Sequence, residues 1–154
     1  MSQKWVVRIA EPKDAETIAR FNVAMAWETE RKRLELPVVI EGVQAALNDP
    51  QHGFYVVAET AGGIAGCCMV TYEWSDWRCG VFWWIQSVYV KPEFRRQKVF
   101  STLYEFLKQR ASREPSVCGF RLYVEGANHT AQATYSQVGM AETSYKLFEE
   151  LFDG

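Results

Sequence analysis

The sequence predicts an α/β fold in which helices cover both faces of a mixed, mostly antiparallel sheet of six to seven strands. Two observations lead to this prediction. Strand-like segments joined by short turns dominate residues 53–90, and a strand–helix–strand unit follows over residues 81–124. The length of 154 residues and the 48% of apolar side chains predict one domain spanning residues 1–154.

The first third of the chain is predicted to hold one strand and two helices. Val6–Ala10 is a short run of strand-forming residues, and Asp14 is a suitable N-cap for the helix that follows. Residues Glu28–Glu35 are densely charged, so we expect them to be exposed or to form a loop. Pro37 begins a second helix, whose apolar face is formed by Val39, Val43, Ala46 and Leu47.

Three strands are predicted in the middle of the chain. They are Gly53–Thr60, Ile64–Trp74 and Val81–Val90, and a turn at residues 61–63 joins the first two as a hairpin. Lys91-Pro92-Glu93 ends the third strand, and apolar residues at helical spacing then predict a helix that reaches Arg113.

The last third is predicted to continue as strand, helix and strand. Phe120–Val124 is the first of these strands, and Thr130–Gln137 is a short helix that Gly139 closes. Ser144–Leu151 shows a loose alternation of apolar residues and is predicted to be the last strand.

Charge and composition exclude several classes of function. The net charge is −2, with 17 basic and 19 acidic residues, so nothing favours a nucleic-acid partner. No apolar run approaches the roughly 20 residues of a membrane span, and the N-terminus lacks the apolar run of a signal peptide. The four cysteines fit no zinc spacing, and two distant histidines predict no metal site. We therefore expect a cytoplasmic protein with reduced thiols.

The segment after the third middle strand is the one that carries chemistry. Residues 85–90 run into Lys91-Pro92-Glu93-Phe94-Arg95-Arg96-Gln97-Lys98 and then a helix. A helix N-terminus offers free N–H groups and a partial positive charge, and Arg95, Arg96 and Lys98 add charge beside it. These residues alone fit a phosphate site and a solvated basic turn equally well.

Residues 88–103, which read Val-Tyr-Val-Lys-Pro-Glu-Phe-Arg-Arg-Gln-Lys-Val-Phe-Ser-Thr-Leu, resemble the acetyl-CoA motif of the Gcn5-related N-acetyltransferases (GNAT). The resemblance implies that the strand backbone at Val88, Tyr89 and Val90 meets the pantetheine arm. It implies that the following turn surrounds the pyrophosphate of acetyl-CoA. The turn residues concerned are Arg95, Arg96, Gln97, Lys98, Val99, Phe100 and Ser101.

The motif departs from the family at two positions, where Lys98 and Phe100 replace glycines. Both are expected in the first helical turn, where φ is negative, so that no glycine-only backbone angle is required. The Lys98 side chain must then turn outward or pair with a phosphate, and weaker cofactor binding is one consequence.

A second segment, residues 128–140, also resembles the family. Asn128 follows a strand, Tyr135 comes seven residues later, and Gly139 and Met140 end the run. By this resemblance Asn128 contacts the cofactor and Tyr135 is the general acid that protonates the departing CoA thiolate. A phenol with a pKa near ~10 is suited to that task. From the residues alone, a packed helix aromatic is the favoured interpretation of Tyr135, and the spacing and the upstream motif favour the acid instead.

The resemblance implies an N-acetyltransferase in which a small-molecule primary amine attacks acetyl-CoA directly, in a ternary complex. Candidates for the general base are Glu73 and Glu125, together with Glu28 and Glu30 in the charged stretch that is expected to flank the acceptor pocket. Each of the four is more simply interpreted as a surface carboxylate. Alternation places Trp83 and Trp84 on opposite strand faces, with one in the core and the other available to an acceptor pocket.

Two other readings stay open at this point. One is a catalytically weak or inactive module that keeps the fold and binds acyl-CoA, and Lys98 is its best support. The other is a nucleotide-binding protein, although the chain lacks the glycine-rich fingerprints of that class. By family analogy a homodimer is expected, with the late strand Ser144–Leu151 pairing across the boundary.

Overall fold

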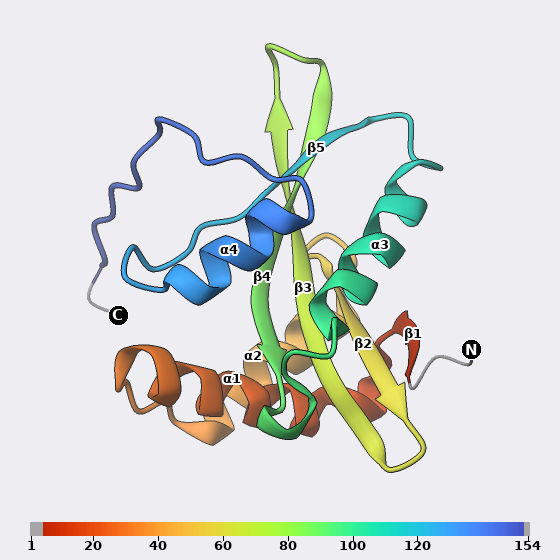
Figure 1. The fold of residues 1–154 in the computed structure, drawn as a ribbon, viewed down its shortest axis with the longest axis vertical. Coiled ribbons are helices and arrows are strands. Elements are labelled where there is room, and N and C mark those ends of the chain that lie inside the picture. Colours follow the sequence, from red (N-terminus) through yellow and green to blue (C-terminus); the bar gives the residue numbers. More distant parts are fainter. Residues whose placement is uncertain (1–4, 153–154) are drawn as a thin grey trace. The chain divides into compact units, whose positions relative to one another are not determined.

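Residues 5–152 are described by a computed structural model (Figure 1). The chain divides into two units, residues 1–123 and 124–154. The first four residues of the N-terminal segment considered above lie outside the described part. Among the described residues, no helix is both long enough and apolar enough to cross a bilayer.

The first unit is built on a five-stranded sheet in which the strands follow their order in the sequence. The strands are β1 (Val6–Ile9), β2 (Phe54–Thr60), β3 (Gly63–Ser75), β4 (Gly80–Val90) and β5 (Val117–Arg121). The pairs from β1 to β4 are antiparallel, whereas β4 and β5 run parallel. The predicted mixed, mostly antiparallel sheet is therefore confirmed, and the long β3–β4 hairpin is its largest part (Figure 1).

Two strand predictions were wrong in detail. The described residues contain five strands rather than six to seven, because Ser144–Leu151 forms no strand. Loose alternation is a weak signal, since a strand also needs a partner that satisfies its backbone groups. The strand predicted at Phe120–Val124 is β5, which begins and ends three residues earlier.

Four helices complete the described chain: α1 (Ala15–Glu30), α2 (Leu36–Asn48), α3 (Val99–Ala111) and α4 (His129–Gln137). Short 3₁₀ turns precede α1 at Pro12–Asp14 and follow β4 at Pro92–Phe94. The charged stretch that was expected as a loop begins inside α1, because that helix continues to Glu30 before Arg31 adopts a left-handed conformation.

Helices cover both faces of the sheet in the first unit, as predicted. On one face, α1 and α2 pack on Tyr55, Val57, Cys67 and Tyr89. On the opposite face, the ring of Tyr104 in α3 meets Phe120 edge to face, and Phe120 stacks on Trp83. Leu103 and Leu107 of α3 are fully buried there.

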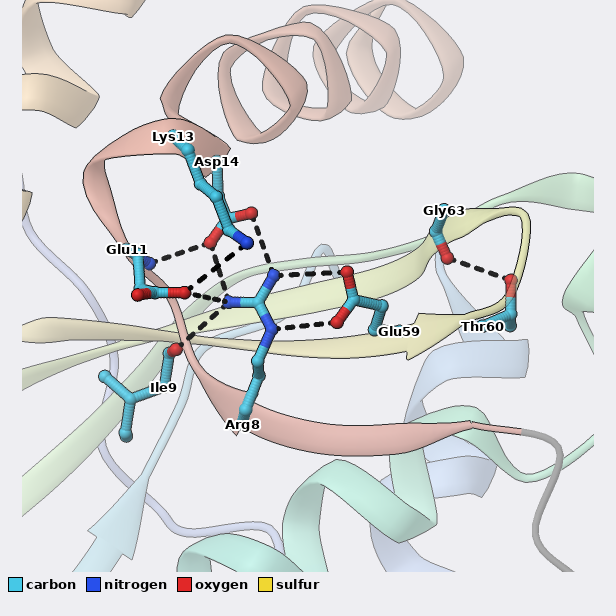
Figure 2. Close-up of polar contacts among 8 residues, drawn as sticks. All are labelled: Arg8, Ile9, Glu11, Lys13, Asp14, Glu59, Thr60 and Gly63. Atoms are coloured by element: carbon cyan, nitrogen blue, oxygen red, sulfur yellow. Dashed lines mark hydrogen bonds and ion pairs between the residues drawn. The ribbon is translucent and has the colours of Figure 1, made fainter.

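Arg8 ties the edge strand β1 to the beginning of α1 and to β2, as Figure 2 shows. Its guanidinium donates to both carboxylate oxygens of Asp14, at 2.8 and 3.0 Å, and to Glu59 at 3.0 Å. Asp14 is only 5% exposed and also accepts the Glu11 N–H at 2.7 Å. Burial alone would raise the pKa of Asp14, but the hydrogen bonds from Arg8 and Glu11 lower it by more.

The connection from β4 to α3 has a backbone that the sequence did not predict. Lys98 is the N-cap of α3 and has φ 66° and ψ 28°, so the expectation of a negative φ at Lys98 was wrong. Phe100 does lie in the first turn of α3, as expected. The beginning of α3 packs closely on β3: a Cβ on Gly66 would meet the Val99 side chain at 3.2 Å and the Tyr89 carbonyl at 2.8 Å.

The cysteines fall into two groups. Cys67 and Cys68 in β3 are buried, and burial raises the pKa of both thiols. Cys79, in the β3–β4 turn, and Cys118, in β5, are exposed. All four are free thiols.

Replacing Asp14 with alanine is expected to lower the free energy of unfolding by about 2 kcal/mol at pH 7, because Arg8 loses its buried partner. Since the folded pKa of Asp14 is depressed, its stabilisation is present at neutral pH and is lost as the pH falls through the folded pKa. Urea unfolding across acidic pH measures both effects. The exposed Glu16–Arg20 pair gives the control, because Glu16→Ala should change stability by less than about 0.5 kcal/mol.

Replacing Lys98 with glycine is expected to raise the free energy of unfolding by about 0.5–1 kcal/mol. A side chain in the left-handed region costs about 1–2 kcal/mol, and glycine removes most of that cost. Gln97→Gly, one residue earlier and outside the left-handed region, should instead destabilise. If urea unfolding shows both variants losing stability, the left-handed Lys98 backbone is refuted.

Candidate functional site

The site is built where β4 changes direction near its end. Cys67 pairs with Tyr89 and Met69 with Gln86, so two β4 residues, Ser87 and Val88, stand opposite Cys68. This is a β-bulge, and Ser87 takes a φ of 52° to accommodate it.

The same strand leaves its parallel neighbour before the bulge. The register between β4 and β5 ends at the pair Trp84 and Arg121, so residues 85–90 continue beyond it. Val88, Tyr89 and Val90, which were predicted to offer backbone to a pantetheine arm, lie in this part of β4. A strand that parts from its neighbour leaves backbone N–H and C=O groups for a ligand along that edge.

Residues 95–101, called the 95–101 turn below, form the second part of the site. Arg96 and Lys98 both have positive φ, at 63° and 66°. The Thr102 N–H donates to the carbonyl of the N-cap residue Lys98 at 3.0 Å, which is the first hydrogen bond of α3. The N–H groups of residues 99–101 therefore lie at the N-terminus of the helix. Left-handed residues next to a helix N-terminus make a concave set of N–H donors that suits a phosphate. The backbone here therefore fits the pyrophosphate of coenzyme A.

The side chains of the turn take separate directions. Arg96 and Lys98 are exposed, where their charges are available to an anion. Phe100 is 7% exposed and packs on Tyr104 with ring centroids 5.9 Å apart, so it does not plug the helix tip. Gln97 donates from its side-chain amide to the Glu93 carbonyl at 3.0 Å.

Arg95 lies differently from its basic neighbours. Its Nε donates to the Val90 carbonyl at 2.8 Å, and one terminal nitrogen donates to Glu28 at 2.7 Å. The Tyr89 hydroxyl donates to the other Glu28 carboxylate oxygen at 2.8 Å. The sequence groups Arg95 with the phosphate-binding residues, whereas the structure turns it toward α1.

These contacts decide the charges of the group. Burial and the hydrogen bond to Glu28 raise the pKa of Tyr89 to about 12, so its hydroxyl keeps its proton at neutral pH. Burial would raise the pKa of Glu28, but hydrogen bonds from Arg95 and Tyr89 lower it by more. Glu28 is thus a firmly ionised, doubly hydrogen-bonded carboxylate, which makes it a poor general base.

Glu73 of β3 is held in a similar way. It accepts the Trp84 indole N–H at 3.0 Å and the Arg121 guanidinium at 2.8 Å, and these contacts lower its pKa. Trp83 and Trp84 lie on opposite faces, as predicted: Trp83 is buried beside Phe120, and Trp84 belongs to this polar group. The structure therefore favours a structural role for Glu73 over that of a base.

A hollow of about 560 Å³ lies beside the end of α1. It is lined by Val23, Ala24 and Trp27 of α1 and by residues 32–35 that follow the helix. The guanidinium groups of Arg31 and Arg33 lie over the Trp27 ring, 5.2 and 4.8 Å from its centroid. Glu28 and Glu30, which were expected to flank an acceptor pocket, are not among the lining residues.

The second unit carries the other predicted site residues on α4. Asn128 is the N-cap of this helix, and its side-chain oxygen accepts the Ala131 N–H at 3.1 Å. Tyr135 is seven residues on, roughly two helical turns, so the two residues share one side of α4. Gly139 has φ 103° and follows the C-cap, which confirms that it closes the helix.

Sequence reasoning missed two features of the site. One is the contact of Glu28 with Arg95, which joins residues 67 positions apart and leaves no periodic signal. The other is the left-handed backbone at Arg96 and Lys98, because neither residue is a glycine. The glycine that the family motif has in place of Lys98 was a signal for the left-handed backbone at that position, and no such signal exists at Arg96.

Comparison with known proteins gives the family. A model of the acetyltransferase (GNAT) family matches residues 16–140. A "possible acetyltransferase" from Clostridium difficile 630 is 41% identical, and the match covers 99% of this chain and 100% of that one with a TM-score of 0.90. No protein of curated function matches the chain.

More distant structures share the fold. A "predicted acetyltransferase" from Clostridium acetobutylicum, solved with acetyl-CoA, is 14% identical over 95% of this chain and 96% of that one, with a TM-score of 0.77. An aminoglycoside acetyltransferase from an uncultured soil metagenomic sample, in complex with sisomicin, is 15% identical over 97% of both chains, with a TM-score of 0.78.

The family model covers well over half of the chain, including β4, the 95–101 turn and α4. The 41% identical structure extends the match across nearly all of it. The chain therefore belongs to the GNAT family of acetyltransferases.

Proposed function

We propose that this protein is an N-acetyltransferase that moves an acetyl group from acetyl-CoA to a primary amine of a small molecule. The observation that carries the proposal is the bulged end of β4, which leads into a turn with two left-handed residues at the tip of α3. The strand edge suits the amide-rich pantetheine arm, and the turn suits the pyrophosphate.

The roles of β4 and of the 95–101 turn follow from this geometry, and the role of Tyr135 follows from the family resemblance of residues 128–140. Acetyl-CoA supplies an activated thioester. A backbone N–H of β4 near Val88 polarises the thioester carbonyl, and the amine forms the new C–N bond as the C–S bond breaks. Tyr135 gives its proton to the sulfur, while the N–H groups of the 95–101 turn, with Arg96 and Lys98, hold the pyrophosphate.

The amine must lose a proton in the same reaction. Glu28 and Glu73 are poor acceptors because their pKa values are lowered by hydrogen bonds, despite burial acting in the opposite direction. We therefore assign the proton to a chain of water molecules rather than to either carboxylate. Two relatives support acyl transfer to an amine: one was solved with acetyl-CoA and the other with the aminoglycoside sisomicin.

A second candidate function is an acyl-CoA-binding module with little or no turnover. Lys98 favours it, because a lysine in the left-handed N-cap position keeps a side chain at the helix tip where the family has glycine. The single domain, the homodimer and the cytoplasmic location stay predictions.

Acetyl-CoA at one hundred times its dissociation constant should stabilise the protein by about 2.7 kcal/mol, which is several degrees in a thermal melt. ADP at the same concentration should shift the melt much less, because it lacks the pantetheine arm. The absence of a shift at millimolar acetyl-CoA would contradict both the enzyme and the binding module.

Tyr135→Phe should lower kcat by about a hundredfold and leave the dissociation constant of acetyl-CoA within about twofold, because only proton transfer to the sulfur is lost. Release of CoA with a panel of amines measures kcat, and calorimetry measures the affinity. Tyr145→Phe, a tyrosine outside the proposed site, is the control. A variant as fast as the wild type rules out Tyr135 as the acid.

A further inference from the structure

Glu28, near the end of α1, joins parts of the chain that are distant in sequence. One carboxylate oxygen accepts the Arg95 guanidinium at 2.7 Å and the other accepts the Tyr89 hydroxyl at 2.8 Å. These partners lie 67 and 61 residues away. A single side chain therefore connects α1, the end of β4 and the beginning of the 95–101 turn.

The partners of Glu28 are themselves fixed in place. The Tyr89 ring is 8% exposed and lies 5.1 Å from the Phe21 ring of α1, centroid to centroid. Arg95 lies over the Tyr89 ring at 5.4 Å and also donates to the Val90 carbonyl. The Arg95 guanidinium is therefore held at two points, by the Glu28 carboxylate and by the Val90 carbonyl.

The backbone that follows Arg95 needs such support. Arg96 and Lys98 both adopt left-handed conformations, each of which costs about 1–2 kcal/mol for a residue other than glycine. The family motif has a glycine in place of Lys98, which avoids this cost at that position, whereas this chain has a side chain at both positions. Arg95 comes directly before Arg96, the first left-handed residue. Its contacts with Glu28 and the Val90 carbonyl therefore restrain the chain where the left-handed conformations begin.

We propose that Glu28 is a positioning residue that, through Arg95 and Tyr89, holds the 95–101 turn in the shape that binds the pyrophosphate. The choice of ligand rests on the proposed function, but the effect on the turn does not. In this proposal Arg95 contributes to binding by connecting the 95–101 turn to Glu28 of α1, and it does not contact the phosphates itself.

Hydrogen exchange of the free protein tests the effect on the turn. Glu28→Gln keeps the size of the side chain but removes its charge, so amide exchange across residues 94–101 should become several-fold faster. Glu16→Gln is the matched control, since it breaks a glutamate–arginine pair on the same helix, at 3.0 Å, and should leave the exchange of the turn unchanged.

Calorimetry with acetyl-CoA tests the route of the effect. Glu28→Gln and Arg95→Gln should each weaken binding by about fivefold, and the double variant should be no weaker than either one. A direct contact between Arg95 and the phosphates predicts a different result, in which the two losses multiply. Arg96→Gln gives the comparison, because its loss should multiply with that of Glu28→Gln.

The outcomes separate this inference from the proposed function. Unchanged exchange in the turn, or losses that multiply for Glu28 and Arg95, would overturn the positioning role even if acetyl-CoA binds well. Wild-type protein that fails to bind acetyl-CoA would refute the proposed function, and exchange alone would then decide the role of Glu28. If Glu28→Gln folds poorly, Arg95→Gln takes its place in the exchange experiment, because it removes the other partner of the Glu28–Arg95 contact.

Discussion

The extra residue in β4 opposite Cys68 is the constraint on which the functional half of the first unit depends. A regular strand would keep its pairing geometry to the end, whereas the bulge turns β4 after its register with β5 has stopped at Trp84. This change of direction at the bulge determines where the Tyr89 side chain and the Val90 carbonyl point. Both groups are then used to fix Arg95, and the left-handed residues follow directly.

Two arginine–carboxylate groups serve different purposes in this fold. Arg8 and Asp14 are the more buried pair, and they attach the edge strand to the start of α1 (Figure 2). Glu28 and Arg95 keep 36% and 42% of their side chains exposed. Pairs with that much exposure contribute little to global stability. Their importance lies in fixing local geometry, which explains why charge at this place can matter for binding more than for folding.

The sequence was sufficient for elements whose signal is local. Alternation placed β2, β3 and β4 within a few residues, and the Trp83–Trp84 pair fell on opposite faces as expected. It failed where a partner decides the outcome. Ser144–Leu151 has the pattern of a strand yet forms none, and the contact of Arg95 with Glu28 leaves no periodic signal in the sequence. The prediction of a negative φ at Lys98 was wrong for another reason: the spacing of apolar residues along a helix does not reveal the backbone conformation of the residue before it.

Two of the four cysteines are buried and two are exposed, so the number of reactive thiols reports whether the sheet is folded. A dye that reacts with thiols should reach Cys79 and Cys118 in the native state, while Cys67 and Cys68 are shielded and resist ionisation. Two labels per chain then report an intact sheet, and four report that β3 has opened. The two exposed thiols of each chain also react with the dye in an assay that detects the thiol of released CoA, so they add a constant background signal to it.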